Sequence, residues 1–104
     1  MKLPEEASFF PADLLAKAER SPDGGEVYWS PADALAAIDV LEKNGKRILG
    51  LDFFKKEGEA MKVLGYPEFD ANRPAPESCR LAREYVRAQK TGEAHRFAIS
   101  WDND

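Results

Sequence analysis

The sequence has one cysteine, Cys79, and one histidine, His95, among its 104 residues. A single thiol cannot form an internal disulfide, and a single imidazole cannot pair with a second one in a zinc site. These side chains are also the only thiol and imidazole for a nucleophile–base pair. We expect Cys79 to be a buried small hydrophobe on a helix and His95 to be solvated at a strand end. The sequence thus predicts no catalytic residues, no metal site and no cofactor.

Long apolar runs and an excess of positive charge are also absent. No stretch of more than six residues lacks Asp, Glu, Lys or Arg, whereas a membrane-spanning helix needs about 20 mostly apolar residues. Residues 1–6 do not begin a secretory signal, so we expect a cytoplasmic chain with no membrane partner. The formal net charge of −4 argues against nucleic acid and favours a basic protein partner. The sequence gives no indication of oligomeric state.

What is present is typical of one globular domain over residues 1–104, because hydrophobic residues make up 43% and aromatic residues 11%. Apolar residues at helical spacing, with capping residues at the ends, predict three helices. β-Branched and aromatic segments predict strands near 27–29, 47–54, 60–65 and 96–101. We expect an α+β fold in which three helices pack on a three- to four-stranded mixed sheet.

The predicted helices differ in how clearly their ends are marked. The first runs from Pro11 to Arg20 and is stopped by the glycine-rich turn at 21–25. The second has Ser30 as its cap, Pro31 in its first turn and an Asn-Gly pair at its end. The third opens at Glu77-Ser78, after a proline-rich surface loop.

Asp52 is the most unusual acid, because it interrupts an otherwise apolar strand. A carboxylate there needs solvent or a partner. It either faces water and pairs with a cross-strand Lys or Arg, or belongs to a functional surface. Alternation places Asp52 on the same face as Ile48, Gly50 and Phe54, and Gly50 leaves a dent beside it. We hypothesise that this face, with the loop from Glu68 to Arg73, receives a basic element of a partner.

Four further residues are candidates for partner binding. Glu68 and Asp70 add negative charge to the loop beside Asp52. Trp29 and Trp101 lie near strand ends, where they are either core aromatics or exposed binding anchors. A glycosidase-like carboxylate pair, Asp52 with Glu68 or Glu77, is the alternative that an enzyme would require.

The order of segments over residues 26–101 resembles the immunity protein 40 family of bacterial polymorphic toxin systems. A capped helix from Ser30 and the strand motif Ile48-Leu49-Gly50, followed by Asp52 and an aromatic residue, carry the resemblance. Tyr66, the third helix and the final strand complete it.

The resemblance implies a small antitoxin that binds and neutralises a cognate toxin domain without catalysis. It implies no particular toxin-contacting residue. A small non-catalytic regulatory or accessory subunit of a larger bacterial assembly is the alternative, since it needs the same features.

Overall fold

The computed structural model describes residues 10–20 and 26–103, so the expectations for residues 1–6 and for the turn at 21–25 lie outside the described residues. In the described part of the chain each helix is followed by two strands, except the last, which is followed by one. In order they are α1 (Ala12–Lys17), β1 (Glu19–Arg20), β2 (Val27–Tyr28), α2 (Pro31–Lys43), β3 (Lys46–Glu57), β4 (Ala60–Gly65), α3 (Ala75–Ala88) and β5 (His95–Asn103).

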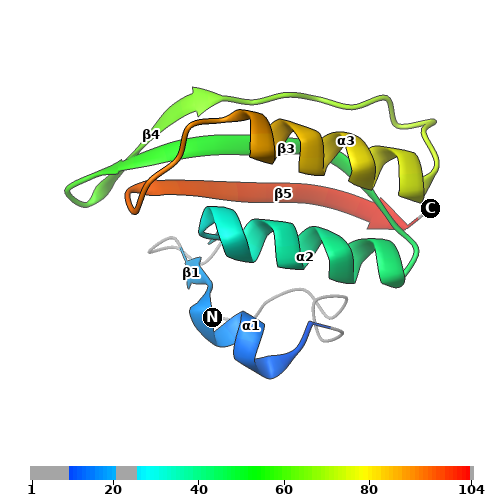
Figure 1. The fold of residues 1–104 in the computed structure, drawn as a ribbon, viewed down its shortest axis with the longest axis horizontal. Coiled ribbons are helices and arrows are strands. Elements are labelled where there is room, and N and C mark those ends of the chain that lie inside the picture. The colour runs from blue at the N-terminus through cyan, green and yellow to red at the C-terminus, as the bar shows by residue number, and fades with distance from the viewer. Residues whose placement is uncertain (1–9, 21–25, 104) are drawn as a thin grey trace.

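The main sheet has three strands in the order β4-β3-β5, and α2 and α3 lie together across one of its faces (Figure 1). The predicted α+β fold with three helices is confirmed. The predicted mixed strand direction is wrong, because both neighbouring pairs are antiparallel. Helix α3 does connect two parallel strands, β4 and β5, but β3 lies between them.

The predicted strand at 27–29 does not join the main sheet as a full strand. Strand β2 pairs instead with β1 in a separate two-stranded antiparallel sheet. Trp29, directly after β2, bridges to β5, where its backbone amide and carbonyl exchange hydrogen bonds with Phe97 at 2.7 and 2.8 Å. The predicted fourth strand is therefore reduced to one bridge at the edge of the sheet.

The first helix ends at Lys17 rather than at Arg20. Ala18 is already extended, and Glu19 begins β1. The Glu19 carboxylate binds Arg96 on β5 and Lys56 on β3. Glu19 is thus extended and ion-paired to residues distant in sequence, although the local sequence favours a helix.

The second helix is capped as predicted. The Ser30 hydroxyl accepts a hydrogen bond from the Asp33 amide at 3.3 Å, and Pro31 stands in the first turn. Gly45, with φ of +69°, allows the sharp turn into β3. Helix α2 and the central strand are thereby joined with almost no loop.

The hydrophobic core lies between the helices and the sheet. It consists of buried side chains from both helices and from the sheet face that they cover, together with Phe10, Leu14 and Trp29 at the N-terminal side. The helices contribute Ala34, Ala37, Ile38, Leu41, Cys79, Ala82 and Val86, and the sheet contributes Ile48, Leu51, Phe53 and Phe97. Burial of this apolar surface is the main stabilising term for a domain of this size.

Candidate functional site

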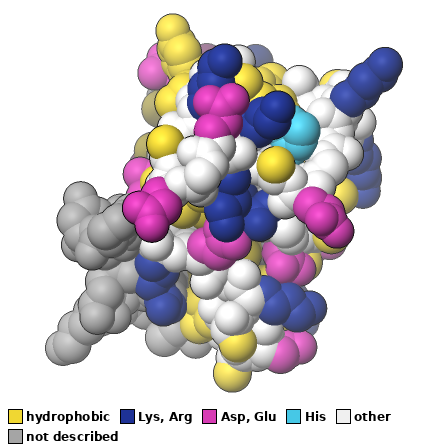
Figure 2. Space-filling view, turned by 90° about the vertical axis from the view of Figure 1, so that its left-hand side faces the viewer, with side chains coloured by type: hydrophobic (Ala, Val, Ile, Leu, Met, Phe, Trp, Pro, Cys, Tyr) yellow, Lys and Arg dark blue, Asp and Glu magenta, His cyan; other side chains and the backbone are white. Residues whose placement is uncertain are grey.

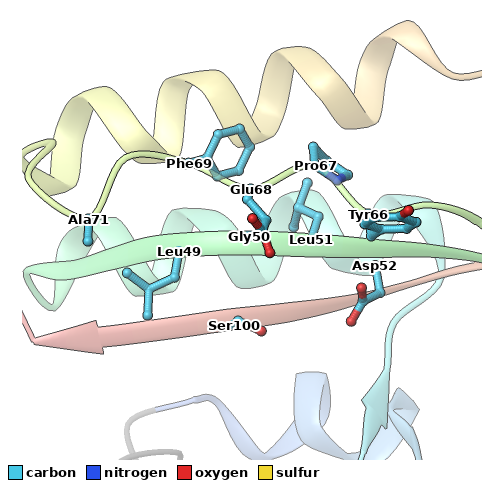
Figure 3. Close-up of a pocket in the computed structure, with 10 residues that line it drawn as sticks. All are labelled: Leu49, Gly50, Leu51, Asp52, Tyr66, Pro67, Glu68, Phe69, Ala71 and Ser100. Carbon is cyan, nitrogen blue, oxygen red and sulfur yellow. The ribbon is translucent and has the colours of Figure 1, made fainter.

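A hollow of about 430 Å³ lies where the middle of β3 meets the segment that follows β4 (Figure 3). We call it the acidic hollow, because two of its lining residues are acids and none of the described residues that line it is basic. Its lining residues are Leu49, Gly50, Leu51, Asp52, Tyr66, Pro67, Glu68, Phe69, Ala71 and Ser100.

Backbone pairing between β3 and residues 67–69 builds one wall of the acidic hollow. The Leu51 amide donates to the Pro67 carbonyl at 3.0 Å, and the Phe69 amide donates to the Leu49 carbonyl at 2.9 Å. Gly50 makes this approach possible, because a Cβ at this position would lie 3.0 Å from the Pro67 carbonyl oxygen. The predicted dent at Gly50 is therefore occupied by backbone, which places Glu68 directly opposite it.

Asp52 lies half-buried on β3, and its cross-strand neighbour on β5 is Ala98. The prediction that Asp52 pairs with a cross-strand Lys or Arg is wrong at this register. Within residues 10–20 and 26–103, its carboxylate makes no ion pair and accepts no hydrogen bond. The structure does bring Asp52 and Glu68 to one hollow, as the hypothesis about this face requires.

The face predicted for Ile48 is wrong. Ile48 pairs with Trp101 while Gly50 pairs with the adjacent Ser100, so Leu49 is an extra residue in β3. Such a bulge shifts the alternation of side chains by one position. Ile48 is consequently buried under the helices, whereas Gly50 and Asp52 line the acidic hollow.

The two loop acids have different surroundings. Glu68 is exposed, and its side chain extends over Gly50 (Figure 3). Asp70 does not line the acidic hollow; its carboxylate accepts a hydrogen bond from the Asn72 amide at 2.9 Å and closes a turn. Glu77 pairs with Arg73 at 2.8 Å in the first turn of α3 and is likewise not a lining residue.

Neither tryptophan belongs to the acidic hollow. Trp29 is a core residue with 4% of its surface exposed, and its ring packs against Phe10 at 5.5 Å between centroids. The prediction that Trp29 binds the partner is therefore wrong, since a buried side chain cannot contact a partner. Trp101 is half-buried and packs against the core, with the Lys46 ammonium 5.8 Å from its ring centroid.

Cys79 and His95 do not form a nucleophile–base pair. The side chain of Cys79, on α3, is fully buried, and burial raises the pKa of its thiol to about 11. The prediction that Cys79 is a buried hydrophobe is confirmed. His95 Nδ1 accepts a hydrogen bond from the Gly92 amide at 2.9 Å, and its ring stacks on Phe53 at 5.4 Å.

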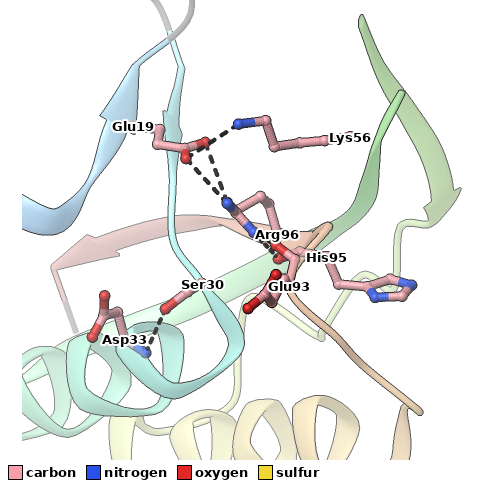
Figure 4. Close-up of polar contacts among 7 residues, drawn as sticks. All are labelled: Glu19, Ser30, Asp33, Lys56, Glu93, His95 and Arg96. Carbon is pink, nitrogen blue, oxygen red and sulfur yellow. Dashed lines mark hydrogen bonds and ion pairs between the residues drawn. The ribbon is translucent and has the colours of Figure 1, made fainter. Parts of the chain in front are cut away.

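A second hollow, of about 740 Å³, lies between β1 and the hairpin that joins β3 to β4. Glu19 in its wall binds Arg96 at 3.1 Å and Lys56 at 3.4 Å (Figure 4). Hydrogen bonding from Arg96 lowers the pKa of the Glu19 carboxyl below its usual value. Because Glu19, Arg96 and Lys56 already pair with one another, this hollow attracts a charged ligand less strongly than the acidic hollow does.

None of the residues predicted to bind a partner is one of the exposed apolar side chains on or directly after β4. Val63, Leu64 and Tyr66 have 52%, 44% and 71% of their surfaces exposed. Tyr66 also lines the acidic hollow. The adjacent apolar residues Val63 and Leu64 are the sequence signal that was available. Side chains of neighbouring strand residues point to opposite faces, so both cannot enter a core on one side of the sheet.

Comparison with known proteins gives no relative from which a site can be transferred. No family model matches the chain, and neither a curated protein nor a solved structure matches it. Over the described residues, no group of three His, Cys, Asp or Glu side chains is placed to hold a metal ion. No helix in that part of the chain is both long and apolar enough to cross a membrane.

Proposed function

We propose that this protein is a cytoplasmic antitoxin that binds a basic domain of a cognate bacterial toxin. The acidic hollow carries the proposal. It combines Asp52, a half-buried carboxylate that makes no ion pair with the described residues, with the exposed carboxylate of Glu68. The resemblance of residues 26–101 to an immunity-protein family supports the class of partner.

Electrostatics favours a cationic ligand in this hollow. Asp52 has already lost part of its water on folding, so an incoming ammonium or guanidinium meets a carboxylate that is only partly screened. Charge-assisted hydrogen bonds to a carboxylate are stronger than neutral ones. A basic side chain of the toxin would thus gain affinity there, and the surrounding negative charge would speed the encounter.

Inhibition by occupancy is the mechanism that fits the side chains. Cys79 is buried with a raised thiol pKa, and His95 accepts a hydrogen bond from the Gly92 amide and stacks on Phe53. We assign neither side chain a role as nucleophile or base. We therefore propose stoichiometric binding that covers the toxin's active surface, rather than chemical modification of the toxin.

The test is co-expression of the full chain with the C-terminal domain of the protein encoded immediately upstream. We expect that domain alone to stop growth, and the full chain both to restore growth and to co-purify with it. Asp52→Asn and Glu68→Gln should weaken both effects. Glu93→Gln, which removes the same charge from an exposed loop before β5, should change neither.

Two results would contradict the proposal in different ways. An upstream domain that is neither toxic nor bound removes the antitoxin function. A domain that binds firmly without being toxic favours the alternative, a regulatory or accessory subunit of a larger assembly.

A further inference from the structure

Strand β4 forms one edge of the main sheet, and its outer side pairs with no other described strand. The large hydrophobic side chains that are exposed in the described residues, Val63, Leu64 and Tyr66, all lie on β4 or directly after it. An apolar edge strand with free backbone groups is a template for a further strand.

The register of the hairpin shows which backbone groups are free. Gly58 and Glu59 form a two-residue turn, in which Gly58 has φ of +64°, and the turn is flanked by the pair Glu57–Ala60. The flanking pair of such a turn exchanges hydrogen bonds, and the following residues alternate. The amide and carbonyl groups of Met61 and Val63 therefore point outward.

We propose that this edge binds an extended segment of the basic partner as a fourth strand, antiparallel to β4. The inference rests on the proposed function, since it assumes a basic protein partner, and it specifies how that partner docks. Tyr66 connects the edge to the acidic hollow, because it is the exposed residue that follows β4 and it also lines the hollow.

Charge sets where the partner's basic residues stand along the added strand. The Tyr66 end of the edge has Asp52 and Glu68 beside it, without a basic lining residue among those described. The hairpin end mixes both signs, and Figure 2 shows Lys and Arg side chains interspersed with Asp and Glu there. An antiparallel strand begins at the Tyr66 end, so the partner's basic residues should stand at the start of its segment.

The same edge is poorly suited to a second copy of this chain. Lys62 is exposed in the middle of β4, and an edge lysine is a common device against self-pairing. In the register that places Met61 opposite Val63, the two Lys62 side chains would stand directly opposite each other, and like charges in that position are destabilising.

The probe is a synthetic peptide of about eight residues, with two arginines near its N-terminus followed by alternating valine and threonine. Titrated into the isotope-labelled full chain, it should shift the amide resonances of Met61, Val63 and Tyr66. Two control peptides have the same length: one carries the arginines at its C-terminus, and the other carries glutamates in place of the arginines. The affinity of each should be lower by a factor of at least about ten. Equal binding of the three peptides overturns the proposed orientation.

N-Methylation of the peptide tests the backbone pairing without altering the protein. Methyl groups on the amides that face β4 should weaken binding more than about tenfold, whereas methyl groups on the alternate amides should not. On the protein side, Val63→Pro removes an outward amide, and Val63→Thr keeps it as the matched control. Val63→Pro should abolish the shifts and Val63→Thr should retain them.

The outcomes separate this inference from the proposed function. No shift along β4 at millimolar peptide overturns the inference, even if the upstream domain binds and is neutralised. Shifts with the peptide but no binding of the upstream domain leave the docking edge in place and remove the antitoxin function. Sedimentation showing a dimer that Val63→Pro dissociates would assign the edge to a second copy instead.

Discussion

The Ser78 hydroxyl accepts a hydrogen bond from the Ile48 amide at 3.0 Å and so fastens α3 to the start of the bulge in β3. The same hydroxyl donates to the Ala75 carbonyl in the first turn of α3, also at 3.0 Å. Ser78 is completely buried. One side chain thus forms hydrogen bonds with both a strand amide and a helix carbonyl.

Ser78→Ala should lower the free energy of unfolding by about 1–3 kcal/mol, the cost of leaving a buried amide without its acceptor. Urea denaturation followed by circular dichroism measures this change. Ser100→Ala, at an exposed position on β5, should stay within about 0.5 kcal/mol of the original protein. Equal effects of the two substitutions would show that the Ser78 hydrogen bonds contribute nothing specific.

Gly50→Ala should disturb the wall of the acidic hollow, because the new Cβ would stand 3.0 Å from the Pro67 carbonyl oxygen. We expect a loss of about 1–3 kcal/mol in unfolding free energy, as for other overpacked sites. The amide resonances of Leu51 and Phe69, which belong to the pairing with residues 67–69, should shift. Gly92→Ala is the control, since its Cβ would meet nothing within 4 Å; a neutral Gly50→Ala would contradict the role given to the glycine.

Glu19 should make folding stability depend on acid pH. In the folded state Arg96 lowers the pKa of the Glu19 carboxyl from its usual 4.5. The ionised carboxylate therefore stabilises the fold above pH 4.5, and this stabilisation is lost as the pH falls through the lowered pKa. The melting temperature of the original protein should therefore fall on acidification below pH 4.5 more steeply than that of Glu19→Gln. Glu93→Gln should keep the original slope, and parallel curves for all three proteins would refute the assignment.

Cys79 should not react with iodoacetamide in the folded protein at neutral pH. The thiol is buried and its pKa is raised to about 11, so both access and thiolate are lacking. Mass spectrometry should detect the adduct only after unfolding in urea. Cys79→Ser should leave binding of the upstream domain intact, and rapid alkylation of the folded chain would reopen the possibility of a reactive cysteine.

Local signals in the sequence predicted most of the helices and strands. The cap at Ser30, the glycine at 45 and the apolar stripe between them gave α2, and β-formers gave the long central strand. The first helix was predicted too long, because nothing local indicates that Glu19 is held by Arg96 and Lys56. The pairing of β2 with β1 joins residues that are close in sequence, Glu19 with Tyr28 and Arg20 with Val27. It was missed because Glu19 and Arg20 were assigned to the first helix.

The site was predicted in part. The anomaly of an acid in an apolar strand drew attention to Asp52, Gly50 and Glu68, which the structure brings together at one hollow. The face assigned to Ile48 was wrong, because a one-residue bulge at Leu49 is invisible to simple alternation. The exposure of Tyr66 follows from the position of β4 at the sheet edge, which strand order decides.

We propose that Asp52 in the acidic hollow contacts a basic toxin domain. The most direct test is the dissociation rate of the upstream domain from the original protein and from Asp52→Asn, measured by surface plasmon resonance beside their melting temperatures. We predict a dissociation rate at least about 30-fold higher, the equivalent of about 2 kcal/mol, with a nearly unchanged melting temperature. An unchanged dissociation rate in a folded Asp52→Asn protein would contradict the account.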